Sequence, residues 1–124
     1  MKYLFILISF LSSIQFSLAA EKAYALQSGD ASLSVAKDGK RLSLQTDNAH
    51  YFSLNAPYVV TLEVNAETLN GYYSSVKEEK ESLVCIAKLK SSHGTVFHVK
   101  DVFTPDTENH FRMDREVTIE KIGK

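Results

Sequence analysis

The chain has few of the residues from which disulfide frameworks and elaborate active sites are built. Its 124 residues include one cysteine, four histidines and no tryptophan. Cys85 cannot form an internal disulfide, and its place in the apolar run 83–87 predicts a small buried side chain. No pair of histidines has the spacing and acidic neighbours of a metal site. A glycine-rich phosphate loop and a G-x-S-x-G nucleophile elbow are also missing. We therefore expect no cofactor, and no catalytic activity from this chain alone.

Charge of one sign is not concentrated anywhere in the sequence. Fourteen lysines and arginines stand against fifteen aspartates and glutamates, and no basic cluster occurs. Binding to nucleic acid requires Lys and Arg gathered on one face, so the sequence predicts no nucleic-acid partner. The same balance argues against electrostatic attachment to a membrane surface.

A long hydrophobic run is absent after residue 20, but a short one begins the chain. Met1 and Lys2 precede a mostly apolar segment over 3–18, and small residues follow at Ala19 and Ala20. The segment is interrupted by polar residues, whereas a spanning helix needs about 20 apolar residues. We interpret 1–20 as a cleaved signal peptide rather than a retained membrane anchor. A secreted or periplasmic location is therefore expected, with no stable membrane anchor after cleavage.

The remaining residues, 21–124, alternate between apolar and polar side chains with the period of β-strands. The clearest hairpin spans 31–45, where an Asp38-Gly39 turn with both central residues at positive φ should place Val35 opposite Leu42. A second hairpin is predicted over 83–103 around a glycine-containing loop, which sets Cys85 opposite Asp101.

Other strands are expected over 49–54, 58–65 and 72–78, the last of them at a sheet edge, with 65–71 as a connection that ends in an Asn-Gly turn. A final strand is expected over 111–119. Because an apolar edge strand invites aggregation, we expect either an earlier strand or a missing remainder of the protein to cover it. No helix-period apolar run and no internal repeat appears after residue 20. The fold class is therefore predicted to be all-β, with 21–124 forming an antiparallel β-sandwich or the N-terminal part of one.

Asp101 and Arg115 interrupt otherwise apolar strand faces. A loop of about six residues should place their strands side by side, so the two charges fall opposite or diagonal to one another. Two opposite charges on a buried face must pair, because an isolated buried charge is very costly. We interpret them as a structural ion pair; the alternative is a polar contact that lines a ligand groove or a domain interface.

Tyrosines supply the other candidate site. Four of them look exposed in the strand pattern and could stack on sugar rings, although strand tyrosines usually serve in packing. These candidates for ligand stacking are Tyr51, Tyr58, Tyr72 and Tyr73.

The segment 99–119 resembles a stretch in the N-terminal β-sandwich of large secreted glycoside hydrolases and related polysaccharide-degrading enzymes of Bacteroides-type bacteria. In those proteins an aspartate-aromatic-threonine strand end is followed by an arginine in the next strand, as 101–104 and Arg115 are here. The resemblance implies a sandwich ahead of an (α/α) toroid that carries most of the catalytic carboxylates. This chain has no toroid and therefore no catalytic acid to which that role could pass.

Two functions follow as hypotheses. The first is a non-catalytic N-terminal β-sandwich portion of a secreted carbohydrate-active, glycoside hydrolase-like protein, whose partner is a following catalytic domain. The second is an independent secreted β-sandwich module for binding or adhesion, with a glycan or a protein as ligand. On the first hypothesis we expect the chain to be the front of a longer polypeptide.

Overall fold

A computed structural model describes residues 23–46, 51–54 and 58–123, with side chains placed for all but 51–54. The proposed signal peptide, 1–20, lies outside the described residues. The described part is all-β, as predicted, and its strands pair antiparallel throughout. It contains no helix long and apolar enough to cross a membrane.

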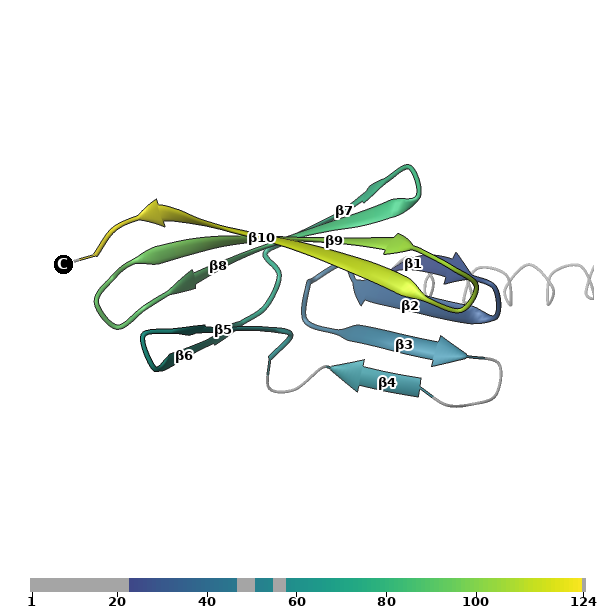
Figure 1. Ribbon diagram of the computed structural model, residues 1–124, viewed down its shortest axis with the longest axis horizontal. Coiled ribbons are helices and arrows are strands. Elements are labelled where there is room, and N and C mark those ends of the chain that lie inside the picture. The colour runs from purple at the N-terminus through teal and green to yellow at the C-terminus, as the bar shows by residue number, and fades with distance from the viewer. Residues whose placement is uncertain (1–22, 47–50, 55–57, 124) are drawn as a thin grey trace, which may run out of the picture.

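Within the described residues, ten strands form two four-stranded sheets and one hairpin (Figure 1). The first sheet has the order β1 (Ala23–Ser28), β2 (Ala31–Ala36), β3 (Leu42–Thr46), β4 (Tyr51–Leu54). The hairpin consists of β5 (Val60–Val64) and β6 (Glu67–Gly71). The second sheet has the order β10 (Phe111–Lys121), β9 (Val96–Pro105), β8 (Ser82–Lys90), β7 (Ser75–Glu79).

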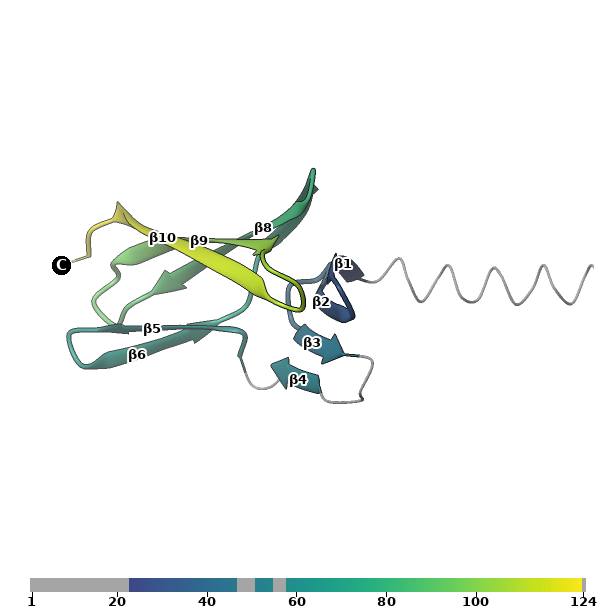
Figure 2. The same cartoon turned by 45° about the vertical axis from the view of Figure 1, so that its right-hand side comes forward.

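The arrangement is sandwich-like. The second sheet forms one layer, and the β5–β6 hairpin and the first sheet lie side by side on its inner side (Figures 1 and 2). Strict alternation on β8 and β9 buries every second side chain, since the pleat sends successive residues to opposite faces. The buried residues of these two strands are Leu83, Cys85, Ala87, Leu89, Phe97, Val99, Asp101 and Phe103.

Both predicted hairpin registers are confirmed. Val35 pairs with Leu42 in the first hairpin, and Cys85 pairs with Asp101 in the second. The turn of the first hairpin differs from the prediction, because only Gly39 has positive φ, at +76°. The loop closes instead through the Gly39 amide, which donates to the Ala36 carbonyl at 2.9 Å, and through the Lys40 amide, which donates to Asp38.

One expectation about connections is wrong. The segment 65–71 is not a connection: Glu67–Gly71 is strand β6, and the turn falls earlier, at Asn65 and Ala66, whose φ angles are +48° and +66°. Asparagine tolerates this left-handed conformation, which lets the chain reverse two residues after β5. Of the two ways in which the last strand could be covered, an earlier strand does not serve within the described residues: β10 is an edge of its sheet, and its residues from Arg112 to Lys121 are exposed. Covering by a remainder of the protein stays a prediction.

Gly39 also allows the first hairpin to contact the second half of the chain. Its carbonyl accepts a hydrogen bond from the Tyr73 amide at 3.1 Å, and a Cβ at residue 39 would lie 1.9 Å from the Tyr73 carbonyl oxygen. Only a residue without a side chain fits this approach, so the glycine positions Tyr73 against the hairpin loop.

We expect Gly39→Ala to destabilise the fold more than Gly94→Ala does. Both glycines have positive φ, which costs a non-glycine residue about 1–2 kcal/mol. A Cβ on Gly94 would meet no atom closer than 3.9 Å, whereas one on Gly39 would overlap the Tyr73 backbone. Urea unfolding of the two variants measures the difference, and equal losses would show that the approach of Gly39 to Tyr73 contributes nothing.

Candidate functional site

A buried carboxylate lies at the centre of the molecule. Asp101 is in the middle of β9, and the alternation that directs Val99 and Phe103 inward directs its side chain to the same face. The residue has no exposed surface. A charge in such a place is tolerated only when its oxygens are satisfied by donors, so its partners decide what the site can do.

Arg115 is the main partner. It lies directly opposite Asp101 in the β9–β10 register, and its guanidinium makes two parallel contacts, Nε to Oδ1 at 2.7 Å and Nη2 to Oδ2 at 2.8 Å. Its Nη1 donates to the Thr61 carbonyl of β5 at 3.3 Å. The structure therefore brings together the two residues that the sequence singled out. Asp101 is buried, while the side chain of Arg115 is 27% exposed.

Tyr73 is a third member that sequence reasoning assigned to a different role. Its hydroxyl donates to Oδ2 of Asp101 at 2.6 Å, and the residue is only 3% exposed. The expectation that this tyrosine stacks on a ligand is therefore wrong. Its position depends on the contact of its backbone with Gly39, a long-range contact for which the sequence gives no signal. We call Tyr73, Asp101 and Arg115 the Asp101 cluster.

Burial and the charge of Asp101 dominate the electrostatics of this cluster. Removal from water raises the pKa of Tyr73 above its ordinary value, and its hydrogen bond to Asp101 raises it further. Cys85, opposite Asp101 on β8, has a pKa raised to about 12, mainly by burial and then by the same carboxylate. The hydrogen bond to Asp101 raises the pKa of Arg115. The thiol and the phenol therefore stay protonated and unreactive at neutral pH.

Hydrogen bonds within the Asp101 cluster satisfy the buried carboxylate. Both oxygens of Asp101 accept bonds, and no buried side-chain nitrogen or oxygen in the described part lacks a partner. Since Asp101 has no exposed surface, its carboxylate is out of reach of a substrate. Chemically the arrangement can hold β9 and β10 to the segment around Tyr73 and to β5, but it offers neither a free base nor a reactive nucleophile.

Of the three remaining tyrosine candidates, two lie close together at the surface and the side chain of the third is outside the described part. Tyr58 is 42% exposed and Tyr72 is half-buried, and their ring centroids are 5.8 Å apart with the planes inclined at 44°. Lys40 Nζ lies 6.0 Å from the centre of the Tyr72 ring. Tyr51 is in β4, where side chains are outside the described part. The structure thus brings two of the four tyrosines together at the surface.

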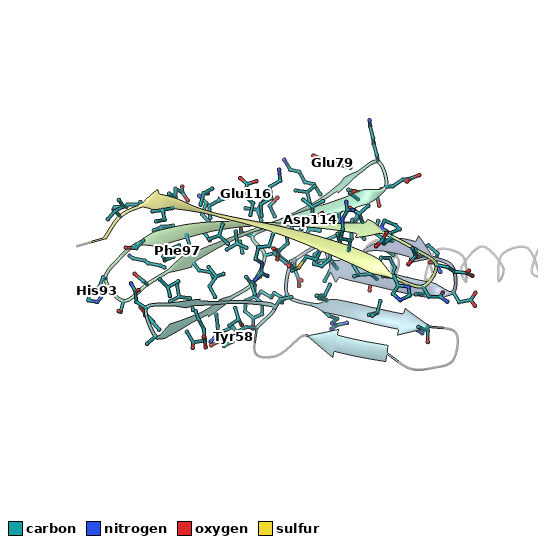
Figure 3. All side chains as sticks on the ribbon, in the orientation of Figure 1. Tyr58, Glu79, His93, Phe97, Asp114 and Glu116 are labelled. Atoms are coloured by element: carbon teal, nitrogen blue, oxygen red, sulfur yellow. The ribbon has the colours of Figure 1, made fainter. Side chains whose placement is uncertain are left out.

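A surface hollow of about 690 Å³ lies where the turn between β5 and β6 faces the loop between β8 and β9. Its lining includes Val64, Phe97 and Ile119, and His93 stands at the end of the β8–β9 loop (Figure 3). The carboxylate of Glu67 in this hollow accepts bonds from the amide and the hydroxyl of Ser92, at 3.0 and 3.2 Å. No group of three metal-ligating side chains occurs among the described residues.

Comparisons of the chain with protein-family models, with curated proteins and with solved structures found no match.

Proposed function

We propose that this chain is a non-catalytic β-sandwich portion of a secreted carbohydrate-active, glycoside hydrolase-like protein. The observation that carries the proposal is the role of the residues behind the resemblance. Asp101 and Arg115, the polar residues of the shared pattern, join β9 to β10 through a partly buried ion pair, and Arg115 also donates a hydrogen bond to β5. A pattern that consists of such residues is typical of a structural domain, because its polar groups bond to one another within the fold.

The carboxylates support a non-catalytic role. Glycoside hydrolysis uses two carboxyl groups that flank the scissile bond in a cleft. The hollow beside the β5–β6 turn is lined by one carboxylate, that of Glu67. This carboxylate already accepts hydrogen bonds from Ser92. A second hollow, over β8 and β9, is also lined by one carboxylate, that of Glu79. Polysaccharide cleavage then falls to a catalytic domain elsewhere in the protein, and this portion supports that domain.

The test is the size and the N-terminus of the native product. Immunoblotting of the producing cells with antibody against this chain should detect, in the secreted or periplasmic fraction, a polypeptide much heavier than 13.9 kDa. Mass spectrometry of that product should find Glu21 as its first residue, and the product should release reducing sugars from a polysaccharide that this chain alone leaves intact. A mature product no longer than this chain would contradict the proposal.

The second candidate is an independent secreted β-sandwich module that binds a glycan or a protein. The exposed Tyr58, with Tyr72 and Lys40 beside it, favours this candidate because an exposed aromatic ring can stack on a sugar. On a glycan array, the full chain should then bind a defined set of sugars. Tyr58→Ala should lose the binding, while Tyr58→Phe, which keeps the ring, should retain it. Equal binding by all three proteins would exclude this surface.

A further inference from the structure

The hollow beside the β5–β6 turn has four large apolar residues in its lining: Val64, Phe97, Ile119 and Ile122. Phe97 is buried, whereas Ile119 and Ile122 are 58% and 78% exposed, more than any other large hydrophobic residue in the described part. Figure 3 places His93 and Phe97 at the same end of the second sheet, beside the β5–β6 hairpin. The volume of the hollow, about 690 Å³, is within the range of about 300–1,000 Å³ that is usual for small-molecule sites.

Hydrogen bonds hold the three walls of this hollow together. The amide and the hydroxyl of Ser92, in the β8–β9 loop, donate to the Glu67 carboxylate of β6. The Gly123 amide, after β10, donates to Oγ1 of Thr95 at 2.9 Å. A Cβ at residue 123 would lie 2.0 Å from the His93 carbonyl oxygen, so the chain after β10 lies directly against the loop. The hollow is therefore formed before a ligand arrives, which lowers the entropic cost of binding.

Glu67 gives the hollow a negative charge. It is the only Asp, Glu, Lys or Arg among the lining residues, and no lysine or arginine of the described part forms an ion pair with it. Two carboxylate oxygens can accept about four hydrogen bonds, and Ser92 supplies two donors, so the carboxylate can accept more. A charge beside apolar surface attracts an opposite charge more strongly than one surrounded by water, because the local dielectric constant is lower.

We propose that this hollow binds a compact apolar molecule that carries one ammonium group. The apolar body of the ligand covers Phe97, Ile119 and Ile122, and the ammonium donates to the carboxylate of Glu67. A neutral molecule of the same shape covers the apolar lining but leaves the charge unmatched, and an anion is repelled by it. The proposal does not depend on the function proposed above, because it concerns the residues of this hollow alone.

Three probes that differ only in their charged end test the proposal in a nuclear magnetic resonance titration of the full chain. Phenethylamine is the cation, phenethyl alcohol the neutral molecule and hydrocinnamate the anion. Phenethylamine should shift the amide signals of Ser92, Thr95 and Gly123 with a Kd on the order of 1 mM, as expected for a ligand of about nine non-hydrogen atoms. Phenethyl alcohol should shift the same signals with about fivefold weaker affinity, and hydrocinnamate should leave them unchanged.

Variants then separate the charge from the apolar lining. Glu67→Gln keeps the size of the side chain and an acceptor for Ser92, and it should weaken phenethylamine about fivefold without changing the affinity for phenethyl alcohol. Ile122→Ser should weaken both probes by the same factor, because it removes apolar surface and leaves the charge in place. Glu63→Gln is the matched control and should change neither affinity, since residue 63 pairs with Thr68 on the other face of the β5–β6 hairpin.

The comparison of the three probes on the wild type needs no variant, so it decides the question even if a variant does not fold. The proposal would be overturned if phenethylamine moved none of the signals around the hollow at concentrations up to about 20 mM. Equal affinities for the cation and the alcohol would also overturn it, because the charge of Glu67 would then play no part. Shifts that Glu67→Gln leaves at their wild-type affinity, or that lie away from the hollow, would do the same.

Discussion

Arg115→Ala is expected to lower the free energy of unfolding by about 3 kcal/mol or more, whereas Arg112→Ala should lower it by less than about 1 kcal/mol. Both arginines are on β10, and each pairs with an aspartate. The difference lies in the partner. Asp101 has no exposed surface, while Arg112 and Asp114 are both 61% exposed.

Removal of Arg115 leaves Asp101 buried with the Tyr73 hydroxyl as its remaining side-chain donor. Breaking a buried pair in this way costs about 3–5 kcal/mol, and the partial exposure of Arg115 places the expectation at the lower end. Arg115→Lys should recover only part of the loss, because an ammonium cannot make the two parallel contacts of a guanidinium.

Urea unfolding of the wild type and the three variants measures these differences. The melting temperature of Arg112→Ala should stay close to that of the wild type, and that of Arg115→Ala should fall by many degrees. If the two alanine variants melted at the same temperature, the Asp101 cluster would not be a source of stability.

The second large effect is a loss of stability at alkaline pH. The pKa of Cys85 is 9.0 in its ordinary state and about 12 in the fold, and the pKa of Tyr73 is raised from 10.0. A raised pKa means that the folded state holds its proton more strongly than the unfolded state. The stability that each group contributes is therefore fully present below the ordinary pKa of that group, and it is lost as the pH rises towards the pKa that the group has in the fold.

Because Cys85 has the lower ordinary pKa, it is the first of the two to lose its proton in the unfolded state. Between about pH 8 and pH 10 this should lower the free energy of unfolding by about 1 kcal/mol. By about pH 11 the two groups together should lower it by about 4 kcal/mol. Cys85→Ala should show a flat stability up to about pH 10, and Tyr73→Phe should show a shallower loss above it, each compared with its own stability at neutral pH. Wild-type stability that stays constant to about pH 11 would contradict the burial of both groups.

Strand registers and buried faces follow from the alternation of apolar and polar residues, and most of them could be predicted from the sequence. The β8–β9 hairpin has its predicted register because apolar side chains at every second position can face the core in only one way, and a shift by one residue would bury Lys88 and His98 instead. The encounter of Asp101 with Arg115 follows from the same rule, since a short loop returns β10 along β9.

What the sequence could not predict depends on contacts between distant segments. Tyr73 and Tyr58 look alike in a strand pattern, and only the packing of Tyr73 against Gly39 and Asp101 separates a core residue from a surface residue. Glycine is a stronger turn signal than asparagine or alanine. The sequence therefore predicts the turn at Gly71, at the end of β6, whereas it lies before β6, at Asn65 and Ala66.

Two hydrogen bonds between the ends of the described chain have a consequence for the order of folding. The Ser28 hydroxyl donates to the Thr107 carbonyl, and the Asp30 amide donates to the side chain of Asn109, each across 79 positions of sequence. During synthesis, the hairpin of β1 and β2 therefore emerges long before the loop between β9 and β10 that anchors its turn exists. Contacts so far apart in sequence slow folding. We expect the turn at Ser28 and Asp30 to gain protection from hydrogen exchange only in the last, slow phase, when β9 and β10 have paired.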